Sequence, residues 1–118
     1  WLTVDLRRQY REVWDISLEG GCNYYRASPL RPPSTKYRGA DGIDLPREMC
    51  TINIPTLVIW GMRDHALGPE LLDGLGDYVS DLTIERLEAA SHWVIHEQPE
   101  VVARAITRFL DAARWAKR

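Results

Sequence analysis

Residues 55–64 of the chain read PTLVIWGMRD, and residues 82–93 read LTIERLEAASHW. The first segment opens with Pro55–Trp60, a short apolar run rich in β-branched residues that ends at Gly61. Such a run is typical of a strand covered on both faces of a parallel sheet. The second segment opens with a further strand candidate, Leu82–Leu87. The sequence therefore predicts two neighbouring strands in the second half of the chain.

An acidic residue and a histidine follow these strands. Asp64 stands just past the first and His92 just past the second, so both are expected at the carboxyl edge of one sheet, where open α/β sheets place their chemistry. A carboxylate behind a histidine fixes its tautomer and stabilises the imidazolium, which suits an orienting acid and a general base. A solvated carboxylate and a surface histidine are the alternative. A zinc site at His92, His96 and Glu97 is disfavoured, since Pro99 is expected to begin a helix only after them.

Two predicted helices alternate with the strands. Pro69–Val79 carries leucines at helical spacing, with Pro69 in the first turn, and the last helix should begin near Pro99. The order strand, helix, strand, helix implies a right-handed crossover and a parallel sheet, and hence the α/β class. The last helix needs a larger sheet than two strands provide. Its apolar stripe is Val101, Val102, Ala105, Ile106, Phe109 and Leu110.

The first part of the chain is predicted to form two helices and an irregular segment. Thr3–Ile16 has helical periodicity, with Thr3 placed as the cap. Leu18–Ala27 is expected to form a second, short helix, whose start is loosened by Gly20 and Gly21. Residues 28–49 contain four prolines and no periodicity. This segment is expected to run over the surface.

Composition narrows the class of protein. The chain has 118 residues, 45% of them apolar, and a formal net charge of −2. These values suit one domain and provide no strong field to attract nucleic acid or an anionic membrane. The longest apolar run, Ile54–Trp60, is too short to span a bilayer. Cys22 and Cys50 make no disulfide framework, so we expect a reducing, cytoplasmic setting. Because the chain starts at Trp1, we also expect it to be a piece of a longer protein.

Several motifs together resemble a known superfamily. Gly61–Asp64 (GMRD) after an apolar strand, Ser91–Trp93 (SHW), and Glu97–Glu100 (EQPE) opening the last helix resemble the carboxyl-terminal end of the α/β-hydrolases. Earlier in the chain, Asn23–Pro29 (NYYRASP) resembles the end of the helical cap in soluble epoxide hydrolases. The resemblance covers nearly the whole chain in the family's order.

This resemblance implies a division of the chain into three parts. Residues 1–28 would be the end of the helical cap, and residues 29–50 a return excursion to the core. Residues 51–118 would be the carboxyl-terminal part of the α/β-hydrolase core, with the last two strands of its parallel sheet and their flanking helices.

The resemblance also implies roles for individual residues. Asp64 would be the acid of the catalytic triad, His92 the base and Tyr25 an acid supplied by the cap. Tyr24 and Trp93 would line the substrate site, although packing is the alternative role for both. In the family, a nucleophilic aspartate opens an epoxide to a covalent ester, tyrosine assists the leaving oxygen, and histidine activates water to release a diol. This chemistry implies a small epoxide or related substrate and requires no cofactor or metal.

The chain departs from the family in one respect. The Gly-x-Asp-x-Gly or Gly-x-Ser-x-Gly turn that holds the nucleophile is absent, and so is the His-Gly segment of the oxyanion hole. Both are expected in the amino-terminal half of the fold, which would be the partner of this chain, and the chain alone is expected to be inactive. The alternatives are another α/β-hydrolase, namely a haloacid dehalogenase or an esterase, or an inert fragment or interaction module. A homodimer is left open as an assembly.

Overall fold

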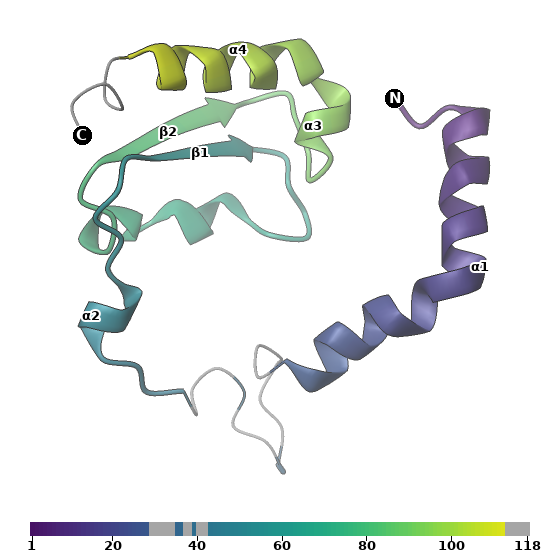
Figure 1. The fold of residues 1–118 in the computed structure, drawn as a ribbon, viewed down its shortest axis with the longest axis horizontal. Coiled ribbons are helices and arrows are strands. Elements are labelled where there is room, and N and C mark those ends of the chain that lie inside the picture. The colour runs from purple at the N-terminus through teal and green to yellow at the C-terminus, as the bar shows by residue number, and fades with distance from the viewer. Residues whose placement is uncertain (29–34, 37–38, 40–42, 113–118) are drawn as a thin grey trace. The chain divides into compact units, whose positions relative to one another are not determined.

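The chain is described by a computed structural model that covers residues 1–28, 35–36, 39 and 43–112. It divides into two compact units, Trp1–Pro46 and Arg47–Arg118, which are described separately (Figure 1). Much of the segment predicted as a return excursion, residues 29–50, lies outside the described residues. Its last part forms the short helix α2 (Arg47–Cys50).

The first unit contains one long helix, α1 (Val4–Ala27), where two helices were predicted. Its start is capped by Thr3, whose hydroxyl oxygen accepts a hydrogen bond from the backbone N–H of Leu6 (3.2 Å). The prediction of a break at Gly20 and Gly21 is wrong, since a glycine costs a helix only about 1 kcal/mol and the backbone ladder continues through both. The helix is bent along its length (Figure 1). The hydroxyl of Ser17 donates to the carbonyl oxygen of Val13 (3.0 Å), a contact that bends helices.

No helix in the described part of the chain combines the length and the apolar character that crossing a membrane would require.

The second unit is built on two parallel strands, as predicted. Strand β1 (Thr56–Gly61) pairs with β2 (Leu82–Leu87) in a register that runs from Thr56 opposite Leu82 to Gly61 opposite Leu87. Strand β1 lies one residue later than expected, because Pro55 has no N–H to contribute to the ladder. The two strands end side by side, so the segments that follow them leave from the same edge.

The connection between the strands differs from the prediction. A helix was expected over Pro69–Val79, but the chain forms two short 3-10 helices, η2 (Pro69–Leu72) and η3 (Leu75–Asp77). Gly74 lies between them with a φ of 74°, a left-handed conformation that interrupts helical hydrogen bonding. Two apolar residues of this segment, Leu72 and Val79, are buried, whereas Leu71 is exposed.

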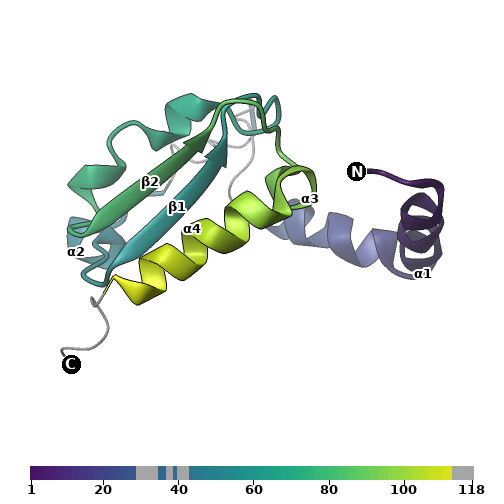
Figure 2. The same cartoon turned by 90° about the horizontal axis from the view of Figure 1, so that it is seen from above.

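Two helices follow β2. The short α3 (Val94–Glu97) was not predicted and includes residues that were expected to precede any helix. The longer α4 (Pro99–Asp111) begins at the expected proline. In both views α4 lies on one side of the two strands, and the connection containing η2 and η3 lies on the other (Figure 1 and Figure 2).

A small apolar core joins α4 to the ends of the strands. Its buried members are Leu87, Ala90 and Val102, against which Ile59, Val94 and Val101 pack. The predicted stripe of α4 is only partly covered, because Ile106 and Leu110 are exposed. A two-stranded sheet is too narrow to cover a full helical stripe. This cluster lies where β2 ends at Leu87 and the loop that carries His92 begins.

Candidate active site

Asp64 lies in a tight turn directly after β1. The turn is closed by the backbone N–H of Asp64, which donates to the carbonyl oxygen of Gly61 (3.1 Å). Its Oδ1 accepts hydrogen bonds from the backbone N–H groups of Ala66 and Leu67, each at 2.8 Å. Aspartate is suited to this position because its short side chain can bond the backbone two and three residues ahead. The turn fixes the direction of the carboxylate.

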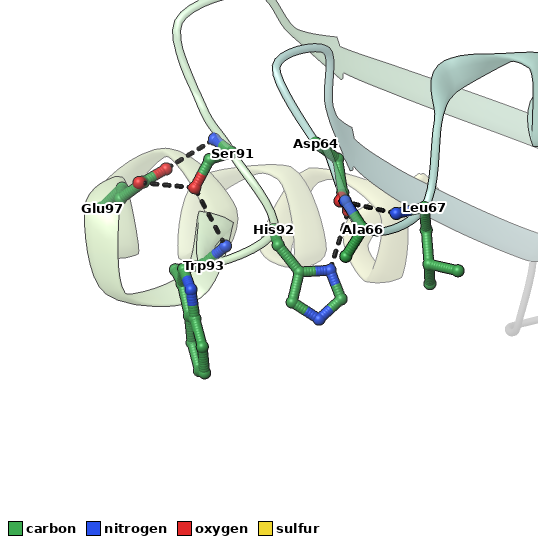
Figure 3. Close-up of polar contacts among 7 residues, drawn as sticks. All are labelled: Asp64, Ala66, Leu67, Ser91, His92, Trp93 and Glu97. Atoms are coloured by element: carbon green, nitrogen blue, oxygen red, sulfur yellow. Dashed lines mark hydrogen bonds and ion pairs between the residues drawn. The ribbon is translucent and has the colours of Figure 1, made fainter.

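The other oxygen of this carboxylate meets His92. Nδ1 of His92 lies 2.8 Å from Oδ2 of Asp64, although the two residues are 28 positions apart (Figure 3). The pairing of β1 with β2 brings them together, since the two loops leave adjacent strand ends. The Asp64 side chain is only 7% exposed, whereas that of His92 is 44% exposed. The carboxylate is thus shielded behind an accessible imidazole.

The surroundings of Asp64 favour its ionised form. Burial by itself would raise its pKa, but hydrogen bonds from Leu67, His92 and Ala66 outweigh burial and lower the pKa below its ordinary value of 3.8. An ionised carboxylate can only accept, so Nδ1 of His92 must be the donor. In the neutral ring this leaves Nε2 as an acceptor of protons. Nε2 is turned away from Asp64 (Figure 3).

The loop that carries His92 is held against the end of β1. The backbone N–H of Met62 donates to Leu87 (3.0 Å), and that of Arg63 donates to Ala90 (2.9 Å). A Cβ atom on Gly61 would collide with the carbonyl oxygens of Ala90 and Ser91. Only glycine allows this close approach, so Gly61 helps to set where the loop runs.

A second contact of this loop was missed in the sequence. Glu97 of α3 accepts hydrogen bonds from the backbone N–H and the hydroxyl of Ser91, at 2.6 and 2.7 Å. The hydroxyl oxygen of Ser91 accepts from the backbone N–H of Trp93 (3.3 Å). The only sequence signal is a serine and a glutamate on either side of His92, and recognising it requires the short helix α3.

Trp93, expected in the substrate site, stands next to the base. Its ring meets that of His92 edge to face, with centroids 5.7 Å apart. Its indole extends to the same side as the His92 ring (Figure 3). Its role as a substrate wall stays a prediction.

Tyr24 and Tyr25 lie in the last turns of α1, in the other unit. Both side chains are exposed, and their rings meet edge to face at 5.6 Å. Tyr25 also lines a hollow of about 530 Å³ along the helix, whose apolar walls include Val13, Trp14 and Leu18. The roles of cap acid for Tyr25 and of substrate contact for Tyr24 stay predictions.

The described residues contain no cluster of three or more His, Cys, Asp or Glu side chains that could hold a metal ion. The groups that meet at Asp64 are its carboxylate, the imidazole of His92 and the backbone donors of the turn. Together they can take a proton from water or a hydroxyl at Nε2 and stabilise the resulting imidazolium.

Comparison with known proteins identifies the family of the chain. No family model matches the sequence. The chain is 33% identical to epoxide hydrolase 1 of Caenorhabditis elegans. The match covers 85% of the chain and 24% of that epoxide hydrolase. The chain is 34% identical to the human monoacylglycerol lipase ABHD6 over 75% of its length, or 25% of the lipase.

Solved structures agree with the sequence matches. The crystal structure of an epoxide hydrolase from Bacillus megaterium, in complex with an inhibitor, matches 93% of the chain with a TM-score of 0.76 and 33% identity. The chain covers 38% of that structure and spans about a quarter of the length of the curated relatives. Sequence and fold together show that the chain belongs to the α/β-hydrolase superfamily, where it resembles the epoxide hydrolases.

Proposed function

We propose that this chain is the part of a larger epoxide hydrolase that supplies the acid and the base of its catalytic triad, Asp64 and His92. The observation that carries the proposal is the 2.8 Å contact between Asp64 and His92, which leaves Nε2 of His92 free of Asp64 and accessible. The likeness to epoxide hydrolases supports the choice of substrate. The remaining catalytic groups would lie in parts of the protein outside these 118 residues.

The first step of the proposed reaction opens the epoxide. A carboxylate outside this chain attacks one ring carbon, a new ester C–O bond forms, and the C–O bond of the epoxide breaks. Tyr25 gives its phenolic proton to the oxygen that leaves, because a phenol is a neutral donor at pH 7 and the developing alkoxide is far more basic. The product is a hydroxyalkyl ester of the enzyme.

The second step hydrolyses this ester. Nε2 of His92 takes a proton from water, and the oxygen of that water adds to the ester carbonyl. Collapse of the tetrahedral intermediate releases the diol, whose new hydroxyl takes the proton held by the imidazolium. The carboxyl group that remains returns its proton to the tyrosinate. Asp64 stabilises the imidazolium during this step and keeps the ring in the required tautomer.

Ester hydrolysis is the second candidate function. The similarity to a monoacylglycerol lipase supports it, and the same acid and base would serve a serine nucleophile equally well. The segment Asn23–Arg26 favours the epoxide branch, because it resembles the cap motif whose tyrosine serves as the proton donor in epoxide hydrolases. On the helix, Arg26 donates to the side-chain oxygen of Asn23 (2.7 Å), so the two ends of this segment are linked.

Two variants of the complete protein separate the steps. With styrene oxide, His92→Gln should still form the ester but not hydrolyse it, so mass spectrometry should detect protein heavier by one substrate molecule. Tyr25→Phe should slow ester formation by about 10²-fold, the usual contribution of a positioned proton donor. His65→Gln is the matched control, because this exposed histidine beside Asp64 should leave both rates unchanged.

The same experiment can reject the proposal. The absence of an adduct in folded His92→Gln would contradict the covalent mechanism. Hydrolysis of a monoacylglycerol but not of styrene oxide by the unsubstituted complete protein would favour the lipase.

A further inference from the structure

Glu97 connects the loop that carries His92 to helix α3. Its Oε2 accepts a hydrogen bond from the backbone N–H of Ser91 (2.6 Å), and its Oε1 accepts one from the Ser91 hydroxyl (2.7 Å), as Figure 3 shows. The hydroxyl oxygen accepts in turn from the backbone N–H of Trp93 (3.3 Å). The residues on both sides of His92 are therefore linked to one carboxylate.

These contacts have the properties of a specific structural link. Hydrogen bonds to an ionised carboxylate are shorter and stronger than those between neutral groups, and both contacts of Glu97 with Ser91 are partly buried. Because the two oxygens bind two different donors of Ser91, they fix the direction of the loop as well as its distance from α3.

The rest of the loop is held by other groups. Backbone hydrogen bonds from Met62 and Arg63 hold the loop where it leaves β2, and they end at Ala90. The carbonyl oxygen of Trp93 accepts from the backbone N–H groups of His96 (2.8 Å) and Glu97 (3.0 Å). Between these two anchors, the side chain of Glu97 holds Ser91. Asp64, on the opposite side, is itself fixed by its turn, so a shift of this segment would separate His92 from the carboxylate that orients it.

We propose that Glu97, acting through Ser91, is a positioning residue that holds the His92 imidazole where Nε2 can take a proton from the hydrolytic water. The inference rests on the proposed function, because it assigns Glu97 to the second step of that reaction. A displacement of about 1 Å can lower the rate of such a step by about 10²-fold. Ring opening uses the nucleophile and Tyr25, so it should not need Glu97.

The test compares the two half-reactions of the complete protein in single turnovers with styrene oxide. In Glu97→Ala, ester hydrolysis should be at least about tenfold slower while ester formation changes less than about threefold, so the ester accumulates. Equal slowing of both steps, or unchanged hydrolysis in the folded variant, would overturn the inference. Rates are expressed per ester formed, so a lower folded fraction cannot imitate the expected result.

Three further variants sharpen the comparison. Glu97→Gln should restore most of the rate, because the amide can accept from the Ser91 N–H and donate to the Ser91 hydroxyl oxygen. Glu100→Ala removes an exposed carboxylate from the first turn of α4 and should change neither step. Ser91→Ala removes only the hydroxyl group and should slow ester hydrolysis without slowing ester formation. This variant replaces Glu97→Ala in the test if Glu97→Ala does not fold. No rescue by glutamine, or slowing by Glu100→Ala, would contradict the positioning role.

A second measurement does not depend on the substrate. The proton on Nδ1 of His92, held by Asp64, should give a low-field NMR resonance that disappears in Asp64→Asn. Glu97→Ala should shift or broaden this resonance, and Glu100→Ala should not. If the protein proves inactive on epoxides, the proposed function fails while this measurement still tests Glu97. An unchanged resonance in Glu97→Ala would overturn the positioning role whatever the substrate.

Discussion

The two carboxylate oxygens of Asp64 have different hydrogen-bond partners. One oxygen holds the turn through Ala66 and Leu67, and the other holds the ring of His92. The backbone donors are fixed by the turn, so they favour a negative charge before any substrate arrives. A carboxylate that is already ionised and directed is suited to stabilising an imidazolium without rearrangement during the reaction.

The lowered pKa of Asp64 leads to a prediction about stability in acid. The folded state favours the ionised form, so Asp64 contributes stability above its ordinary pKa of 3.8, and this contribution is lost as the pH falls through the lowered folded-state value. Asp64→Asn should therefore reduce the free energy of unfolding at pH 6, and its deficit relative to wild type should shrink towards pH 3. Denaturant unfolding of the complete protein at several pH values measures this difference.

Asp73→Asn is the control for this series, since Asp73 follows η2 and its side chain has none of the contacts of Asp64. A deficit of Asp64→Asn that is constant between pH 6 and pH 3 would contradict the interpretation.

For single residues, the sequence predicted the pair of Asp64 and His92 but not the groups that hold these two side chains in place. Asp64 and His92 were identifiable because each follows a strand, and parallel strands end at one edge. The donors at Ala66 and Leu67 are backbone groups and leave no residue-type signal. The link between Ser91 and Glu97 depends on α3, a single turn that is too short to produce periodicity.

The elements of the second unit were predicted where a strong pattern was present. Strand β1 is a short apolar run that ends at a glycine, β2 carries three apolar residues among six, and α4 has both a proline start and an apolar stripe. The effect of glycine on the helices was not predicted correctly. The helix predicted over Pro69–Val79 is interrupted at Gly74, whereas α1 continues through Gly20 and Gly21. Spacing alone does not reveal which glycines adopt a left-handed conformation.

Gly61, the last residue of β1, allows a prediction about how tightly the end of this strand packs against the following loop. In Gly61→Ala the new methyl group would meet backbone oxygens of Ala90 and Ser91, which cannot rotate away as a side chain can. We expect the free energy of unfolding of the complete protein to fall by about 1–3 kcal/mol, the usual cost of overpacking. Thermal or denaturant unfolding measures the change.

Gly76→Ala is the matched control. A Cβ atom there would meet no heavy atom within 4 Å among the described residues, so the variant should be neutral or slightly stabilising. Equal stability of Gly61→Ala and Gly76→Ala would show that the loop after β2 can move away from β1 without cost, which would weaken the case for a rigid site.

At the scale of the whole molecule, the chain carries the pair of Asp64 and His92 on part of the α/β-hydrolase fold. The sheet described here has two strands, and several large apolar side chains of the second unit are exposed, among them Ile52, Ile54 and Leu110. The solved relatives are longer, and the chain covers 38% of the Bacillus megaterium structure. Under the proposed function, further strands of the same sheet elsewhere in the protein would cover this apolar surface and supply the nucleophile.

This reasoning predicts that the 118-residue chain alone converts no styrene oxide above background. A general base contributes only about 10²–10⁴-fold to a rate, and here it has no ester to hydrolyse. The complementary control is the complete protein with His92→Gln, which keeps the nucleophile and should form the ester that the isolated chain cannot form. Circular dichroism and the low-field resonance of His92 show whether the isolated chain has folded. Turnover by the folded chain at a rate close to that of the complete protein would place the nucleophile within these residues and would require a different mechanism.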